Sequence, residues 1–163
     1  MGDVQVGGQD KVVIQTMART KTENTEELIR EINTYATSGA EIVRVAVFDA
    51  LDAEALHTVT QATNVPIVAD IHFNHLYALK AVEAGVHKIR INPGNIGSED
   101  KVKAVVEACR EKHIPIRIGI NAGSLEKDIL KTYGRTAEAM VESAKRHVAL
   151  LENLDFTDII LSL

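Results

Sequence analysis

The sequence predicts an α/β protein built from parallel (β/α) repeats, and two observations carry this prediction. Short apolar runs alternate with helical patterns along all 163 residues, and such alternation indicates parallel strands joined by right-handed helical crossovers. Several of these runs also contain a charged side chain, which is costly in a buried parallel strand unless it has a partner or a ligand. The runs with such residues are Ile42–Val47, Pro66–His72, Lys88–Asn92 and Pro115–Asn121.

The expected elements follow one another in a regular order. Apolar runs bounded by turn residues predict strands, and apolar residues three or four positions apart predict helices. The strands are expected at Lys11–Met17, Ile42–Val47, Pro66–His72, Lys88–Asn92, Ile114–Asn121 and from about Thr157 onwards. Helices fill the intervals, and their expected N-caps are Asn24 or Thr25, Asp52, Asn74, Ser98 and Thr136. Gly39 and Gly85 are expected to end the first and third helices.

The polar residues at the strand ends distinguish between two parallel architectures. In a doubly wound sheet they gather at one switch point, whereas in a barrel they recur around one mouth. They recur here in five consecutive repeats, so we expect an incomplete TIM barrel with about six of the eight strands. Because a complete barrel needs about 250 residues, residues 1–163 are expected to form a single truncated barrel domain, cut inside the apolar strand at Leu163.

Such a domain would leave two strand edges bare. Bare edges present unpaired backbone groups and pair readily with another chain. We therefore expect a homodimer or a domain-swapped oligomer.

Composition excludes several classes of protein. The net charge of −5 does not favour a nucleic-acid or membrane partner. The sequence contains no apolar run long enough to span a membrane and no recognisable signal peptide, so a cytoplasmic setting is expected. Cys109 is the one cysteine; it cannot form an internal disulfide or, alone, a zinc or iron–sulfur site, and we interpret it as a small core thiol.

Three arginines are expected to converge in this otherwise acidic protein. Side chains alternate sides along a strand, so Arg44, Arg90 and Arg117 meet if their sides face the barrel lumen. Asp70 supplies one negative charge, and the surplus positive charge indicates an anionic ligand, most simply a phosphate or diphosphate. The alternative is that each arginine pairs with a carboxylate on a neighbouring element.

Other polar residues surround the same strand ends. Asp70 and His72 share one side of their strand, and they are candidates for acid–base chemistry, for a metal site or for a structural hydrogen bond. No third ligand is evident, which makes metal the poorer interpretation. The loop Asn92–Ser98 leaves a strand and opens a helix, where backbone N–H groups could bind an anion or only turn the chain. A similar loop begins at Asn121. The remaining histidines, including His147, are interpreted as surface or helix residues.

Six segments, in this order and spacing, resemble one known family, 4-hydroxy-3-methylbut-2-enyl diphosphate synthase. The two longest are KIRINPGNIG (Lys88–Gly97) and IPIRIGINAGSLEKDIL (Ile114–Leu130). The shorter ones are VGG (Val6–Gly8), VVIQTM (Val12–Met17), IVRVAV (Ile42–Val47) and VADIHF (Val68–Phe73). The resemblance covers nearly the whole chain. One departure lies at Met17–Thr20, where the family's Met-Thr-x-Thr is replaced by Met-Ala-Arg-Thr.

The resemblance implies an oxidoreductase of the methylerythritol phosphate route to isoprenoids. Such enzymes open 2-C-methyl-D-erythritol 2,4-cyclodiphosphate reductively, with two electrons that pass from ferredoxin or flavodoxin through a 4Fe-4S cluster. The family fold is an N-terminal (β/α)8 barrel and a C-terminal domain that holds the cluster through three cysteines and one glutamate. In the homodimer, the cluster domain of one subunit caps the barrel of the other.

Carried onto this sequence, the resemblance makes Arg44, Arg90 and Arg117 part of a diphosphate clamp. The residues implied to line the same pocket and hold the methylerythritol part are Asp70, His72, Asn92 and Asn121. The cluster ligands, the remaining strands, a clamp lysine and a pocket glutamate would all lie beyond Leu163. This chain is therefore expected to bind neither a cluster nor a metal and to be inactive by itself.

Two alternatives remain open from the residues. One is a barrel transferase or lyase that uses Asp70 and His72 on a phosphorylated substrate without redox chemistry. The other is a non-catalytic module that binds a small anion.

Overall fold

Six parallel strands form one sheet in the computed structural model, which describes residues 2, 4–8 and 10–163. The strands pair in sequence order, each with the next, from β1 to β6. Their bounds are β1 Gln15–Met17, β2 Ile42–Val47, β3 Ile67–Ile71, β4 Lys88–Ile91, β5 Ile116–Gly119 and β6 Ile159–Ser162. Sequential parallel pairing with helical crossovers confirms the predicted (β/α) architecture.

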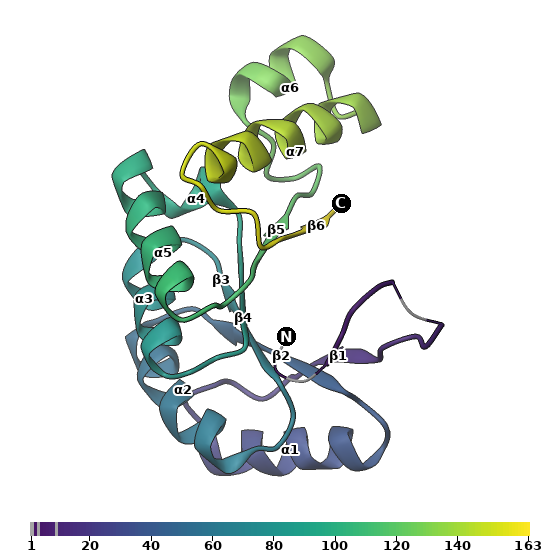
Figure 1. Cartoon of the computed structure of the whole chain (residues 1–163), viewed down its shortest axis with the longest axis vertical. Helices are drawn as coiled ribbons and strands as arrows, with labels where there is room; N and C mark the ends of the chain where they lie inside the picture. Colours follow the sequence, from purple (N-terminus) through teal and green to yellow (C-terminus); the bar gives the residue numbers. More distant parts are fainter. Residues whose placement is uncertain (1, 3, 9) are drawn as a thin grey trace.

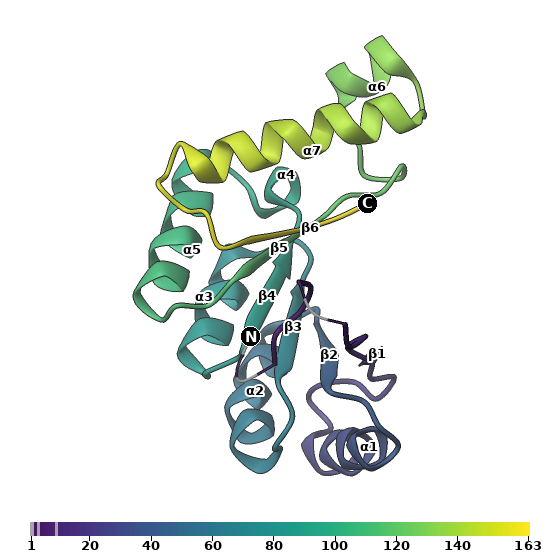
Figure 2. The ribbon, with the colours of Figure 1, turned by 45° about the vertical axis from the view of Figure 1, so that its right-hand side comes forward.

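Helices occupy each interval between strands. Their bounds are α1 Thr25–Thr37, α2 Ala50–Ala62, α3 His75–Glu83, α4 Pro93–Ile96, α5 Glu99–Glu111, α6 Lys127–Tyr133 and α7 Ala137–Glu152. Helices α1, α2, α3 and α5 form a row along the convex side of the sheet (Figure 1). The sheet curls away from this row into a half-barrel, with α7 across its upper end (Figure 2).

The two faces of the sheet differ in chemistry because side chains alternate along each strand. The helix-facing side of β2, β3 and β4 is apolar and packs into the main core: Val43, Val45, Val47, Ile67, Ala69, Ile71, Ile89 and Ile91. The opposite face carries Arg44 on β2, Asp70 on β3, Arg90 on β4 and Arg117 on β5. The charged residues of the strands therefore lie on the concave side of the half-barrel.

Several boundaries differ from the sequence prediction. Strand β1 begins at Gln15 rather than Lys11, because register pairing with β2 starts at Gln15↔Ile42 and Val12 and Ile14 lie exposed at the edge. Helix α2 begins at Ala50, so its cap is Asp49, whose side chain accepts from the backbone N–H of Asp52. The predicted Asp52 cap was therefore wrong.

Of three other predicted caps, two form a side-chain cap hydrogen bond and one does not. Asn74 and Thr136 cap α3 and α7 as predicted, each through a side-chain oxygen that accepts a backbone N–H. Ser98 occupies the N-cap position of α5 but makes no side-chain cap hydrogen bond. Helices α4 and α6, which lie in segments expected to be loops, were not predicted.

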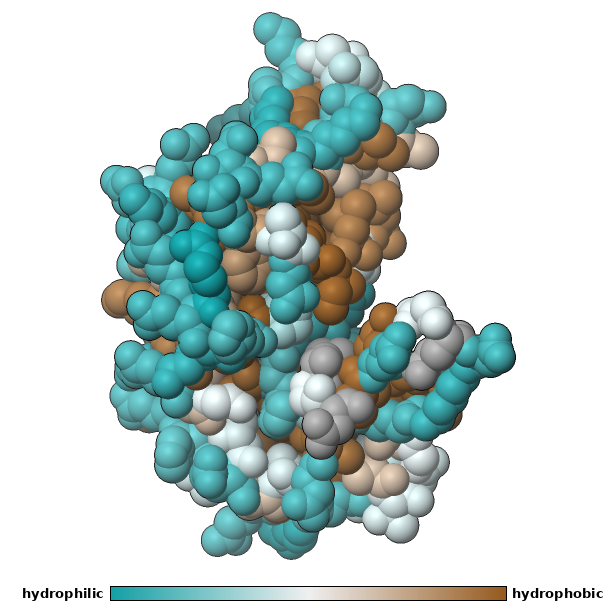
Figure 3. All heavy atoms as spheres, viewed as in Figure 1, coloured by the Kyte–Doolittle hydropathy of each residue, from teal (hydrophilic) through white to brown (hydrophobic). Residues whose placement is uncertain are grey.

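The half-barrel has two edge strands, β1 and β6. Apolar residues are exposed on its open side near β6, where Leu161 and Leu163 are 47% and 59% exposed, and the space-filling view shows apolar atoms beside the hollow of the molecule (Figure 3).

Candidate functional site

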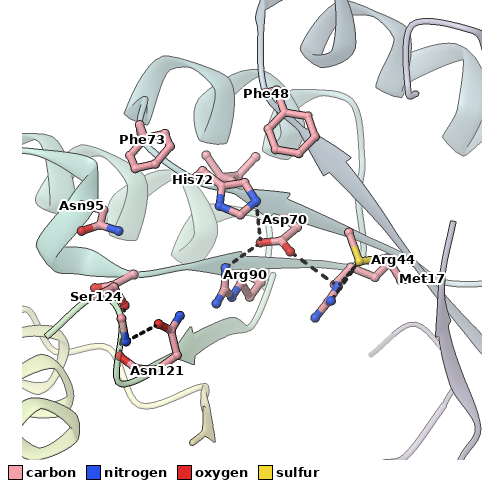
Figure 4. A pocket seen from close by; sticks show the side chains of 13 residues that line it. Met17, Arg44, Phe48, Asp70, His72, Phe73, Arg90, Asn95, Asn121 and Ser124 are labelled. Carbon is pink, nitrogen blue, oxygen red and sulfur yellow. Dashed lines mark hydrogen bonds and ion pairs between the residues drawn. The ribbon is translucent and has the colours of Figure 1, made fainter. Parts of the chain in front are cut away.

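A polar cavity of about 630 Å³ opens at the carboxyl ends of the strands. In (β/α) barrels this end carries the binding site, because the loops that follow the strands surround it. The lining side chains come from β1 to β5 and the loops after them: Met17, Arg44, Phe48, Asp70, Ile71, His72, Phe73, Arg90, Asn92, Asn95, Asn121, Gly123 and Ser124. Figure 4 shows several of these side chains pointing into the cavity.

Asp70 is the centre of the cavity's charge arrangement. Its Oδ1 accepts a hydrogen bond from Arg90 Nη1 at 3.0 Å, and its Oδ2 lies 3.5 Å from Arg44 Nε. The sheet register explains this convergence, since Asp70 lies beside Arg90 on β4 and beside Ala46 on β2, two residues beyond Arg44. One buried carboxylate is thus shared by two guanidinium groups (Figure 4).

His72 and two phenylalanines form the upper wall of the cavity. His72 Nε2 lies 3.9 Å from Asp70 Oδ1, and the imidazole stacks on Phe48 with ring centroids 5.2 Å apart. Phe73 lies tilted against the same ring at 5.9 Å. Both phenylalanines are largely exposed. Sequence reasoning missed them, although Phe48 directly follows β2 and Phe73 lies two residues after β3. Barrel sites are built at these strand ends.

Arg117 lies on the same face but below the cavity mouth. It is the register partner of Arg90, and its Nη2 donates a hydrogen bond to Ser162 Oγ on β6 at 2.6 Å. Burial, and then the positive charges of Arg44 and Arg90, lower its pKa from the usual arginine value. Among the described residues no carboxylate lies within ion-pair distance of Arg117, and the cavity lining does not include it. It contributes positive charge to the cavity without contacting it.

Lys88 is a fourth cation on the concave face, and sequence reasoning missed it. It shares its side of β4 with Arg90 and is only 3% exposed. Burial, followed by the charges of Arg117 and Arg44, lowers the pKa of its amine to about 8. The alternation argument that selected Arg90 also selects Lys88, so the signal was present in the sequence. We refer to Arg44, Lys88, Arg90 and Arg117 as the cationic cluster.

The absence of a side chain at Gly119 lets Arg90 reach its position. A Cβ built on Gly119 would lie 2.7 Å from Arg90 Nη2, which is closer than real Cβ contacts allow. Arg90 therefore crosses the surface of β5 at this glycine. A close approach of a neighbouring group is one of the main reasons for a glycine inside a strand.

Asn92 and Asn121 organise the two loops that form the lower wall. Asn92 Oδ1 accepts from the backbone N–H of Gly94 at 3.0 Å, and its Nδ2 donates to Ser124 Oγ at 3.2 Å. Asn121 Oδ1 accepts from the backbone N–H of Gly123 at 3.0 Å. These hydrogen bonds join the loop after β4 to the loop after β5. All the residues proposed from the sequence except Arg117 line the cavity.

The described residues do not fit an iron–sulfur cluster. Cys109 is buried on α5 against the core, and burial raises the pKa of its thiol to about 12. Cluster ligation needs several thiolates. Among the residues that the structure describes, no three His, Cys, Asp or Glu side chains form a group able to hold a metal ion.

The arrangement favours binding of a polyanion. The cationic cluster outnumbers Asp70, and guanidinium groups bind phosphate oxygens through paired hydrogen bonds. Excess buried positive charge is unfavourable without an anion nearby. Fold and site together define a (β/α)-barrel protein with an arginine-rich pocket at the carboxyl ends of its strands.

Comparison with known proteins gives the family. The chain belongs to the GcpE TIM-barrel domain family, whose model matches residues 1–163. It is 54% identical to the 4-hydroxy-3-methylbut-2-en-1-yl diphosphate synthase (flavodoxin) of Shouchella clausii, over all of this chain and 45% of that protein. The proteins of the same name from Exiguobacterium sibiricum and Nitratiruptor are 56% and 55% identical over all of this chain and 44% and 46% of theirs. The chain thus spans under half the length of these relatives. The resemblance seen in the sequence is confirmed.

Solved structures support the fold alone. Dihydropteroate synthase from Yersinia pestis aligns with a TM-score of 0.67 at 13% identity, covering 93% of this chain and 57% of that one. Phospho-2-dehydro-3-deoxyheptonate aldolase from Thermotoga maritima aligns with a TM-score of 0.67 at 16% identity, covering 99% of this chain and 44% of that one. None of the described helices combines the length and apolarity needed to cross a bilayer.

Proposed function

We propose that this chain is the substrate-binding barrel portion of a 4-hydroxy-3-methylbut-2-en-1-yl diphosphate synthase, and that its pocket binds 2-C-methyl-D-erythritol 2,4-cyclodiphosphate. One observation carries the proposal: three arginines and a lysine lie on the concave face around a single carboxylate, Asp70. The names of the relatives, all of which are diphosphate synthases, support the same substrate class. They favour this enzyme over a barrel transferase or lyase and over a simple anion-binding module.

Each lining residue has a role in this proposal. Arg44 and Arg90 bind the diphosphate directly, and Arg117 supports them with its charge from below. Asp70 keeps the two guanidinium groups oriented through its two oxygens. Asn92, Asn121 and His72 hold the methylerythritol part, because carboxamides and imidazole suit hydroxyl groups. His72 and Asp70 are the candidates for moving a proton.

Reduction would require groups outside residues 1–163. A single buried thiol cannot ligate a 4Fe-4S cluster, so this chain alone is expected to bind the substrate without reducing it. The relatives' names include flavodoxin, which supports flavodoxin as the electron donor of the complete enzyme, with ferredoxin as the alternative. The proposal includes a cytoplasmic location and a homodimeric or swapped assembly.

Titration calorimetry with the cyclic diphosphate tests the proposal. Arg90→Ala removes a charge-assisted contact and should weaken binding by about 1.5–3 kcal/mol, which is roughly tenfold or more. Arg135→Ala is the matched control, because Arg135 is an exposed arginine that does not line the pocket. Equal affinities of the two variants and the unmodified chain would reject the proposed anion site.

A further inference from the structure

A partly buried carboxylate and a buried imidazole lie behind the pocket, and the proposed binding does not use them. Glu126 precedes α6, and its Oε1 lies 3.0 Å from Nε2 of His147 on α7. Its Oε2 accepts a hydrogen bond from Ser143 Oγ at 2.7 Å. Ser143 and His147 are one helical turn apart, so both can face the same carboxylate. We refer to these three residues as the Glu126 cluster.

The burial of this cluster requires an explanation beyond stability. His147 and Ser143 are 4% and 1% exposed. Among the described residues, neither ring nitrogen of His147 nor Oε1 of Glu126 makes a hydrogen bond, so the 3.0 Å contact between Nε2 and Oε1 is an ion-pair distance. A buried ionisable pair pays a desolvation cost that well-packed apolar residues avoid, so it is weak evidence for stabilisation. In some proteins such groups instead fix one arrangement of the segments that they join.

The Glu126 cluster contacts the two loops that form the lower wall of the pocket, after β4 and β5. Glu126 ends the loop that begins at Asn121 and contains Ser124, which accepts the hydrogen bond from Asn92. On the other side, the His147 ring packs against Gly94, where a Cβ would lie 3.2 Å from His147 Cε1. The same Cβ would lie 3.3 Å from Asn92 Oδ1. The Glu126 cluster therefore contacts both loops from the side that faces away from the cavity.

We infer that Glu126 and His147 are positioning residues, which fix the loops after β4 and β5 and thereby the carboxamides of Asn92 and Asn121 in the pocket. Neither residue lines the cavity, so their effect on a ligand is indirect. The consequence for substrate binding rests on the proposed function. The positioning itself does not.

The first experiment uses the ligand-free chain. His147→Leu keeps an apolar side chain but removes the ring nitrogens, whereas His147→Gln places an amide N–H where Nε2 lies. If the cluster positions the loops, the NMR signals of the Asn92 and Asn121 side-chain amides should shift or broaden in His147→Leu and return close to their original positions in His147→Gln. If His147 only fills space, the asparagine signals should stay nearly unchanged in His147→Leu and shift in His147→Gln. That result would overturn the inference.

Two further variants complete the design. Lys145→Gln is the matched control, because Lys145 lies two residues before His147 and pairs with Glu142 of the same helix at the surface; its variant should leave both signals unchanged. Ser143→Ala removes one hydrogen bond to Glu126 without adding volume, and it decides the matter if His147→Leu does not fold. Unchanged asparagine signals in Ser143→Ala would then refute the positioning role.

Calorimetry with the cyclic diphosphate provides the second readout. His147→Leu should weaken binding about tenfold and His147→Gln about twofold or less, since a lost contact to a charged group is worth roughly that much. Should the unmodified chain not bind the cyclic diphosphate, the proposed function fails, while the amide signals still decide the positioning role. Full affinity in His147→Leu would overturn the inference.

Discussion

Lys88 holds an amine inside the half-barrel, where its ionic neighbours are also cations. The pKa of the amine falls to about 8, first because of burial and then because of Arg117 and Arg44. In the unfolded chain it returns to its usual value of 10.5. At neutral pH the folded protein therefore carries a charged lysine at a cost on the order of 3 kcal/mol, since one pKa unit is worth about 1.4 kcal/mol.

This difference predicts a pH dependence of stability. Between pH 8 and 10.5 the unfolded chain holds the Lys88 proton and the folded chain has released it, so the Lys88 contribution to the free energy of unfolding should rise with pH. Urea titrations at pH 7.5 and 9.5 measure this contribution by comparing the original chain with Lys88→Met, which should lack it. Lys103→Met, at an exposed site on α5, serves as control. Identical pH slopes in all three proteins would contradict the prediction.

His147 adds a second effect of pH on stability, in the acidic range. Burial is the main influence on its pKa and lowers it from 6.5, while Glu126 opposes this shift and Arg146 adds to it. The neutral imidazole is therefore the form that suits the folded state. Stability from this group is present above about pH 6.5 and is lost as pH falls further.

Single residues also show where sequence reasoning succeeds and fails. Strand alternation located Arg44, Asp70 and Arg90 on one face, because the side-chain period of a strand is fixed. His147 was interpreted as a surface or helix residue, and it lies on α7 but buried. Its partner Glu126 and its neighbour Gly94 come from other repeats, and a helix pattern alone does not reveal contacts between distant segments.

At the scale of elements, the strands were easier to predict than the connections. The apolar runs from β2 to β5 are distinctive, and the structure confirms a strand within each of them. The edge strand β1 is shorter than its apolar run because only Gln15–Met17 pairs with a neighbour. Helices α4 and α6 are short, at 4 and 7 residues, and tertiary contacts rather than a long apolar period stabilise such helices.

Asp52 does not cap α2, but its side chain makes hydrogen bonds that connect two loops. It is fully buried, and its two oxygens accept the backbone N–H groups of Glu23 and Phe48, at 2.9 and 3.0 Å. Asp52 thus joins the loop after β1 to the loop after β2. Phe48 is also part of the pocket wall.

We expect Asp52→Ala to destabilise the protein more than Asp49→Ala does. Loss of the Asp49 cap should cost about 1 kcal/mol, whereas loss of Asp52 removes two partly buried hydrogen bonds to a carboxylate, each worth about 1.5–3 kcal/mol. Ser98→Ala should change little, because Ser98 makes no cap hydrogen bond. Chemical denaturation of the three variants measures the order, and a larger loss for Asp49→Ala would contradict it.

At the scale of the whole molecule, the two edge strands are expected to govern association. Strands β1 and β6 each have one neighbour in the sheet, and β6 carries exposed apolar residues. Edges of this kind pair with other chains unless charge or covering prevents it. The expectation of a dimer or a swapped oligomer stays a prediction.

Light scattering over a range of protein concentrations tests whether the chain associates. The chain should shift towards dimers or larger species as concentration rises, and Leu161→Lys on β6 should reduce this association because a lysine on an edge opposes pairing. Val141→Lys is the matched control, since Val141 is 41% exposed and lies on helix α7. A sharp monomer signal from the unmodified chain at high concentration would count against the prediction.

The glycine at position 119 has a wider consequence. Because the Arg90 guanidinium occupies the space that a side chain there would need, the direction of this guanidinium depends on an uncharged position on the adjacent strand. A methyl group at that position would turn the guanidinium away from Asp70 while leaving every ionisable residue of the protein in place. The placement of charge in this pocket therefore depends on steric room as well as on which residues are charged, and a survey of charged residues alone would overlook Gly119.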